Sequence, residues 1–130
     1  MDDTFQTANT PDAGYTAALE LGTLLREHRG GDVLVMDLRK LNGWTDFFVL
    51  ATVTSTTHLL GLEQHLKDFS REKGLEILRR SPRPAALARS SSEEEWRIID
   101  LGDIVIHLMT AQTRAFYELE RLWSMADVVF

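Results

Sequence analysis

Residues Trp96 to Trp123 read WRIIDLGDIVIHLMTAQTRAFYELERLW, and this stretch decides the fold. Two runs of β-forming residues, Trp96–Leu101 and Ile104–Met109, flank a turn signal at Gly102-Asp103. The second run passes almost directly into a helical pattern over about 111–125. The stretch therefore predicts a β-hairpin that leads into a helix.

The two faces of this hairpin differ in character. If Leu101 and Gly102 form the loop, alternation places one set of residues on a single face: Trp96, Ile98, Asp100, Asp103, Val105 and His107. The other face carries ordinary core positions: Arg97, Ile99, Leu101, Ile104, Ile106 and Leu108. In this register Asp100 lies opposite Asp103, and two facing carboxylates repel each other.

The face that carries Trp96 has two interpretations. In the first it is exposed and binds a partner. In the second Trp96 packs beneath a helix, and the aspartates only cap the turn. Periodicity supports the two equally, and a one-residue shift in register would exchange the faces.

Length and composition limit the class of protein. A chain of 130 residues with 44% hydrophobic and 26% charged residues is typical of one soluble globular domain. The net charge of -6 repels nucleic acid on average and favours a basic partner. The absence of cysteine excludes disulfides, thiolate metal sites and a cysteine nucleophile. Apolar runs too short for a bilayer, and an acidic, polar beginning, predict a cytoplasmic protein without a membrane partner.

Periodicity also predicts the elements that precede the hairpin. They are a helix over about Thr16–His28, buried strands at Val33–Leu38 and Phe47–Thr52, a helix capped by the hydroxyls of 54–57 and ending at Gly74, and a short edge strand at Leu75–Leu78. In the last helix we assign Phe116 and Trp123 to packing and Arg114 to the polar side.

The domain is expected to span residues 14–126, with a flexible tail at 1–13 and a C-terminal tail at 127–130. The segment 79–95 is rich in Arg, Pro and Ser, and this composition predicts a mobile basic loop. The loop's arginines would either contact a phosphate backbone or simply be solvated.

Sites for chemistry are weakly indicated. Asp37 and Asp46 invite comparison with the paired carboxylates that hold Mg²⁺ in nucleotidyl transfer, but no Asp-x-Asp pair or Gly-Ser phosphate loop accompanies them. His58 and His65 lack a third ligand at metal spacing. We therefore predict no catalytic residue, no cofactor and no metal.

Three blocks taken together resemble a known family: VLVMDLRKLNGWTDFFVLATVTSTTH, WRIIDLGDIVIHLM and RAFYELERLW. Their order and spacing, over about 32–123, are similar to those of the ribosomal silencing factor family (RsfS, also called Iojap). The most specific piece is Trp96-x-x-x-Asp100-x-Gly102-Asp103, followed by His107 and by Arg114-x-x-Tyr117-x-Leu119-Glu120-x-Leu122-Trp123. Val53 and Thr57 depart from the family, which has Gly and Arg there. The segment before Trp96 is also longer and richer in arginine, so its role does not carry over.

The resemblance implies an α/β domain with a mixed β-sheet flanked by helices, nucleotidyltransferase-like without catalytic carboxylates. It implies a protein that is no enzyme. Members bind large-subunit ribosomal protein fourteen at the intersubunit face of the large ribosomal subunit and sterically block joining of the small subunit, repressing translation under nutrient limitation. The alternatives are a large-subunit assembly factor and a nucleotide-binding remnant of the nucleotidyltransferase fold.

The resemblance and the hairpin pattern together predict one partner-binding set: Trp96, Ile98, Asp100, Asp103, Val105, His107 and Tyr117. Trp96 would be the aromatic anchor, and the aspartates would face Lys or Arg on the basic partner. The same face would also allow pairing with a second copy, which gives a homodimer. No direct sequence-specific binding of nucleic acid is expected.

Overall fold

The computed structural model describes residues 12–41, 45–81, 95–122 and 124–130, of which 79–81 and 122 are described by their backbone alone. Its elements, in chain order, are α1 (Ala13–Glu27), β1 (Gly31–Asp37), η2 (Arg39–Leu41), β2 (Phe47–Val53), α2 (Thr56–Lys73), β3 (Arg79–Ser81), β4 (Trp96–Asp100), β5 (Ile104–Thr110), α3 (Ala111–Tyr117), α4 (Leu119–Leu122) and β6 (Asp127–Val128). The strands form one mixed sheet in the order β3-β4-β5-β2-β1-β6. β2 and β5 run parallel, and every other neighbouring pair is antiparallel. The predicted α/β class is confirmed.

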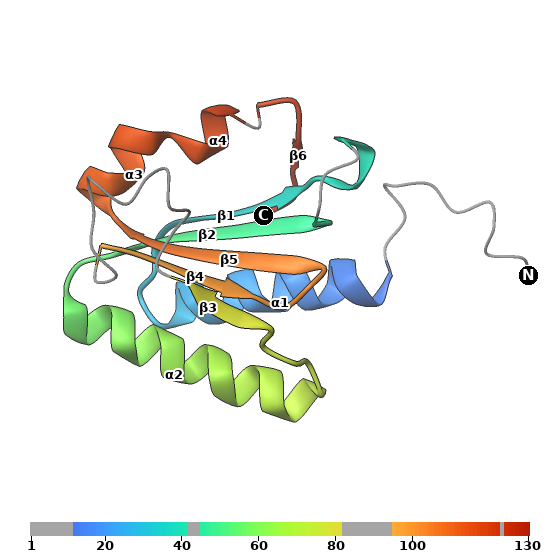
Figure 1. Ribbon diagram of the computed structural model, residues 1–130, viewed down its shortest axis with the longest axis horizontal. Helices are drawn as coiled ribbons and strands as arrows, with labels where there is room; N and C mark the ends of the chain where they lie inside the picture. The colour runs from blue at the N-terminus through green and yellow to red at the C-terminus, as the bar shows by residue number, and fades with distance from the viewer. Residues whose placement is uncertain (1–11, 42–44, 82–94, 123) are drawn as a thin grey trace, which may run out of the picture.

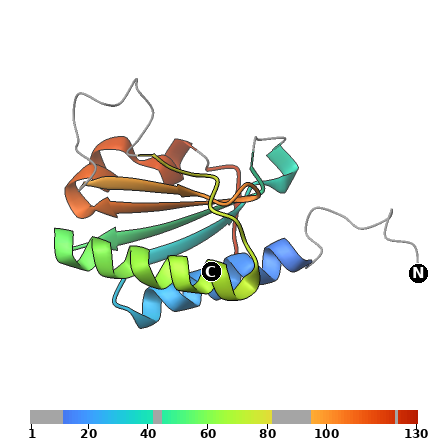
Figure 2. The same cartoon turned by 60° about the horizontal axis from the view of Figure 1, so that its bottom comes forward.

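Helices cover both faces of the sheet (Figure 1). α1 and α2 lie on one face, and α3 and α4 lie on the other, which the turned view shows as a second layer (Figure 2). Side chains of α1 and α2 pack with one apolar face of the sheet, including Val35, Val49, Ile99 and Ile106. A smaller cluster lies on the opposite face and contains Met36, Phe48, Leu50, Trp96, Val105, Met109 and Leu119. Both faces of the hairpin are therefore core.

The hairpin turns one residue later than predicted. Its loop is Gly102-Asp103, closed by a hydrogen bond from the Leu101 backbone N–H to the Ile104 carbonyl at 2.8 Å. Gly102 has a φ of +93°, which a two-residue hairpin turn requires and which glycine adopts without strain. The register consequently shifts by two residues, so that Asp100 lies opposite Val105. A shift of two residues leaves each side chain on its predicted face of the hairpin. It separates Asp100 from Asp103, so the prediction that these two carboxylates lie opposite each other is wrong.

Two predicted boundaries also need correction. The edge strand expected at Leu75–Leu78 occurs at Arg79–Ser81 as β3, which pairs with β4. Residues 127–130 are no tail, because β6 pairs with β1 and Val129 N–H donates to the Val35 carbonyl at 2.9 Å. The remainder of the predicted tail (1–11) and of the predicted loop (82–94) lies outside the described residues.

The single helix predicted over 111–125 is broken. α3 ends at Tyr117, Glu118 has a φ of +47°, and α4 begins at Leu119. A left-handed residue ends a helix and redirects the chain. The break changes which side chains of this segment reach solvent. No helix among the described residues is long and apolar enough to cross a bilayer.

Candidate partner-binding surface

Trp96 is a buried residue. Its side chain lies in the cluster beneath α3 and α4, and the residue is 1% exposed. The indole N–H donates to His107 Nδ1 at 3.1 Å, and the ring centroid lies 5.0 Å from that of Tyr117. The prediction of an exposed tryptophan anchor is wrong, because the chain's own last helices cover this face of the sheet. Val105, fully buried in the same cluster, is not exposed either.

His107 is the polar member of this cluster. An indole nitrogen only donates, so His107 Nδ1 is the acceptor and the ring proton of the neutral imidazole lies on Nε2. Burial lowers the pKa of His107 to about 3, so the ring is uncharged at neutral pH. Within the described part of the chain, Nε2 is buried and has no hydrogen-bond partner. His107 is therefore an uncharged, buried partner of Trp96 beneath α3 and α4.

The other predicted site residues reach the surface. Ile98, Asp100 and Tyr117 are half-buried, and Asp103 is exposed. They follow the hairpin from α3 to its turn. The Asp100 carboxylate accepts the Gly102 N–H at 2.8 Å, so Asp100 also caps the turn.

Sequence reasoning missed Phe116. The helical pattern predicts that Phe116 packs in the core, but it is 68% exposed, because α3 ends one residue later and the expected apolar stripe is interrupted. Its ring makes a T-shaped contact with Tyr117, with centroids 4.7 Å apart. Phe116 and the four accessible site residues, Ile98, Asp100, Asp103 and Tyr117, are called the β4 rim below.

The turn end of the β4 rim is acidic. The backbone N–H groups of Asp46 and Phe47 both donate to the Asp103 carbonyl at 3.0 Å, and Thr45 Oγ1 donates to the Gly102 carbonyl at 3.1 Å. These bonds hold Asp46 beside Asp103. Burial, and then the Asp103 charge, raise the pKa of Asp46, while Arg39 opposes that rise. A cation at this end would relieve the repulsion.

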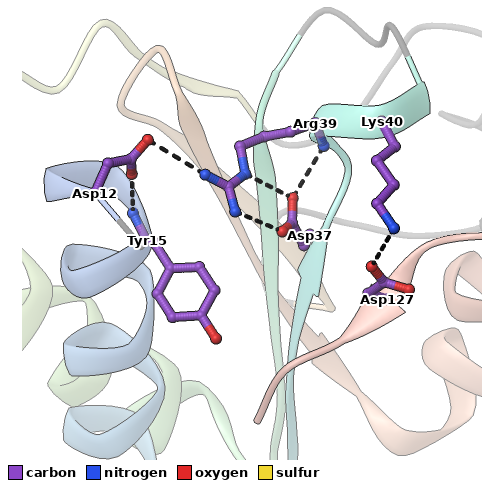
Figure 3. Close-up of polar contacts among 6 residues, drawn as sticks. All are labelled: Asp12, Tyr15, Asp37, Arg39, Lys40 and Asp127. Carbon is purple, nitrogen blue, oxygen red and sulfur yellow. Dashed lines mark hydrogen bonds and ion pairs between the residues drawn. The ribbon is translucent and has the colours of Figure 1, made fainter. Parts of the chain in front are cut away.

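Arg39 organises the neighbouring carboxylates (Figure 3). Its Nε and Nη2 donate to the two oxygens of Asp37 at 3.0 and 2.8 Å, and Nη1 donates to Asp12 at 3.2 Å. These hydrogen bonds to Asp37 are the main reason that the pKa of Arg39 is raised. Asp37 is 4% exposed and both of its oxygens are occupied by Arg39. The comparison of Asp37 and Asp46 with a magnesium pair therefore does not fit this geometry.

Arg114 is a second residue that periodicity misplaced. It is 7% exposed, and its guanidinium donates to Glu120 Oε2 at 3.1 Å and to Thr52 Oγ1 at 2.9 Å. A longer contact of 3.4 Å reaches the Gly31 carbonyl. Arg114 thus joins α3, α4 and two strands. A spacing of six residues between Arg114 and Glu120 brings them together only because Glu118 breaks the helix.

The histidines of α1 and α2 lie together but form no metal centre. His28 and His65 stack with ring centroids 3.6 Å apart, and His58 contacts the Thr54 N–H and the His28 carbonyl. Across the described ranges, no group of three or more His, Cys, Asp or Glu side chains has an arrangement that would hold a metal ion.

Comparisons with known proteins agree on one family. The family model described as "Ribosomal silencing factor during starvation" matches residues 11–129. A ribosomal silencing factor RsfS from Treponema pallidum is 39% identical over 108 residues, which cover 83% of this chain and 90% of that protein. The mouse protein named "Mitochondrial assembly of ribosomal large subunit protein 1" is 32% identical over 81% of this chain, which spans 44% of its length.

A crystal structure of a protein from Bacillus halodurans has the same fold. It superposes with a TM-score of 0.66 at 26% identity and covers 88% of this chain and 98% of that one. The family match extends over nearly all of the described residues, and the most specific sequence block lies on the hairpin, α3 and α4. The chain belongs to the ribosomal silencing factor family, RsfS.

Proposed function

We propose that this protein binds large-subunit ribosomal protein fourteen at the intersubunit face and sterically blocks joining of the small subunit, which represses translation under nutrient limitation. Membership in the RsfS family supports a ribosome-associated role. The proposed mechanism is occupied volume, without catalysis and without a cofactor. When this protein is bound at the intersubunit face of the large subunit, the small subunit cannot occupy the same space.

The β4 rim is the proposed contact. The observation that carries this proposal is the exposure of an aromatic residue, Phe116, on α3 and of an acidic residue, Asp103, in the turn of the hairpin. Central aromatic side chains supply much of the binding energy of protein interfaces, and acidic groups favour a basic partner. Trp96, Val105 and His107 act from beneath as positioning residues.

Subunit-joining measurements test the proposal. Purified large subunits are incubated with the protein and sedimented, small subunits are then added, and joined ribosomes are measured by light scattering. We expect the protein to sediment with large subunits and to reduce joining in proportion to occupancy. Absence of co-sedimentation, or normal joining at full occupancy, would contradict the proposal.

Large-subunit assembly is the second candidate, favoured by the name of the mouse relative. Sucrose gradients of depleted cells separate the two functions. Immature large-subunit particles would indicate assembly, whereas mature subunits that join too readily would indicate silencing.

Three finer points belong to the same proposal. We place the protein in the cytoplasm, and we retain a homodimer through the hairpin region as a form that would compete with the ribosome. The likeness to nucleotidyltransferases is proposed for the fold alone, because Arg39 occupies the Asp37 carboxylate.

A further inference from the structure

A groove of about 480 Å³ lies between α1 and α2. Both helices cover the same face of the sheet (Figure 2). They run antiparallel, because His28 stacks on His65 with ring centroids 3.6 Å apart, whereas Lys73 Nζ lies 3.8 Å from Glu20 Oε1. The groove is therefore on the face of the sheet opposite to α3 and Phe116.

Part of the groove lining is apolar. It consists of Tyr15, Leu19 and Leu24 from α1 and Phe69 from α2. Phe69 is 9% exposed, and Tyr15 and Leu24 pack against the larger core cluster, so the core holds these side chains in place. Leu19 is half-buried. Apolar side chains of a partner would gain burial on this surface.

The groove is elongated along α1. Its polar edge is one stripe of that helix, in which Thr16, Glu20, Thr23 and Glu27 recur at spacings of three and four residues. At a rise of 1.5 Å per residue this stripe extends for about 16 Å, or about three helical turns. A groove of this shape between two helices fits a third helix, whose side-chain ridges enter it.

The groove has an excess of negative charge. Three glutamates line it, and Lys73 is the one cation among the described residues of the lining. Lys73 is already engaged with Glu20 and with the Phe69 ring, whose centroid lies 5.7 Å from Nζ. The other two glutamates, Glu27 and Glu72, are exposed and form no ion pair within the described ranges.

The neighbouring arginines do not line the groove. Arg26 precedes Glu27, but its guanidinium lies over the Phe130 ring, 4.2 Å from the centroid. Arg71 pairs with Asp68. Two of the three glutamates therefore have no counterion within the groove, which favours a cationic occupant.

We propose that this groove binds a basic amphipathic helix of another protein. The apolar side of that helix would pack on Leu19, Leu24 and Phe69, and its Lys or Arg side chains would face Glu27 and Glu72. The net charge of -6 favours the approach of a basic partner. Because the groove and the β4 rim lie on opposite faces of the sheet, this partner and the large subunit would bind at the same time.

A titration with a synthetic peptide tests the groove without a ribosome. The peptide is an amphipathic helix of Leu and Lys, and backbone amide shifts are followed by NMR. One control replaces every Lys with Glu, and a second scrambles the Leu/Lys sequence so that no apolar stripe remains. We expect saturable shifts around Leu19, Thr23 and Phe69 with the amphipathic Leu/Lys peptide alone. Equal shifts with the scrambled peptide, or shifts centred on α3, would overturn the proposal.

Charge variants fix the sign of the preference. Glu27→Gln and Glu72→Gln should each weaken binding of the Leu/Lys peptide about two- to fivefold, as for exposed ion pairs. Glu76→Gln is the matched control, because Glu76 is exposed and lies outside the lining. Lys73→Gln should bind at least as tightly as the wild type, because it frees Glu20. Weaker binding in Lys73→Gln with unchanged binding in Glu27→Gln would show an anion site and overturn the proposal.

An apolar variant tests the packing. Leu19→Ala should weaken peptide binding by at least about fivefold, because part of the apolar surface that the peptide buries is lost. Leu60→Ala, at a residue 52% exposed on α2 and outside the lining, should leave binding unchanged. Equal effects of the two substitutions would place the peptide elsewhere. Thermal unfolding of each variant identifies any loss of fold.

Large-subunit binding separates this inference from the proposed function. If the wild type fails to bind large subunits, the proposed function is wrong, and the peptide titration still decides the groove. If the wild type binds, saturating Leu/Lys peptide should leave it on the subunit. Release of the protein by the peptide would contradict simultaneous binding.

Discussion

Trp96 Nε1 donates to His107 Nδ1 at 3.1 Å, across a hairpin in which these residues do not occupy directly opposed positions. The bond is buried and joins two side chains that the sequence pattern predicts on a partner-facing surface. It makes Trp96 a support for Tyr117, whose ring centroid lies 5.0 Å away, and hence for the β4 rim.

Trp96→Phe should lower the free energy of unfolding, and it should have a smaller effect on large-subunit binding by the β4 rim. The substitution removes the donor and leaves His107 Nδ1 buried without a partner, which costs about 1–3 kcal/mol in addition to lost packing. Urea unfolding at neutral pH measures the change. Trp96→Phe that is as stable as the wild type but no longer binds large subunits would instead restore Trp96 as a direct contact.

Stability should fall with acid because of His107. The folded pKa of about 3 lies below the ordinary value of 6.5, so between these pH values the unfolded chain binds a proton that the folded chain does not. The contribution of His107 is therefore fully present above about pH 6.5 and is lost progressively toward pH 3, with a slope of up to about 1.4 kcal/mol per pH unit. His107→Gln, measured by urea unfolding across this range, should show a flatter dependence. An identical slope in this variant would contradict the assignment.

Arg114→Gln should loosen the last two helices. It removes the hydrogen bonds to Glu120 and Thr52, at a cost of about 2 kcal/mol, since Glu120 is partly solvated. Limited proteolysis should cut earlier after α3 than in the wild type, and urea unfolding gives the free energy. Arg121→Gln is the matched control, because Arg121 pairs with Glu118 on the exposed side of the same segment and should have little effect.

The hairpin shows what sequence could predict and what it could not. Alternation assigned residues correctly to the two faces of β4 and β5, because a register shift of two preserves them. Alternation alone does not say whether a second layer covers a face, and burial of Trp96 depends on α3 and α4 returning over the sheet. That return depends on Glu118, whose left-handed backbone no helical pattern reveals. The misplacement of Phe116 and Arg114 follows from that one residue.

Phe116→Ala should weaken large-subunit binding without loss of stability. The side chain is 68% exposed, so its removal costs little folding free energy, whereas an interfacial aromatic anchor contributes about 2 kcal/mol or more to binding. Sedimentation binding gives the affinity, and thermal unfolding gives the stability. Leu60→Ala is the control, because Leu60 is 52% exposed on α2, across the sheet from α3. Equal losses in the two variants would argue against the β4 rim.

Asp103→Asn should have opposite effects on folding and on binding. The charge of Asp103 helps to raise the pKa of Asp46, so in the folded state Asp46 holds its proton to a higher pH than in the unfolded chain. That stabilisation exists at acid pH and is lost as pH rises through the folded pKa, which means that the two ionised groups oppose folding at neutral pH. Removing the Asp103 charge should therefore raise the melting temperature slightly at pH 7, and the gain should vanish at pH values where Asp46 is protonated.

Binding of Asp103→Asn to large subunits should weaken, and its salt dependence should become shallower, because one charge that faces the basic partner is gone. A variant that is both more stable and an equally tight, equally salt-sensitive binder would place the contact elsewhere on the molecule.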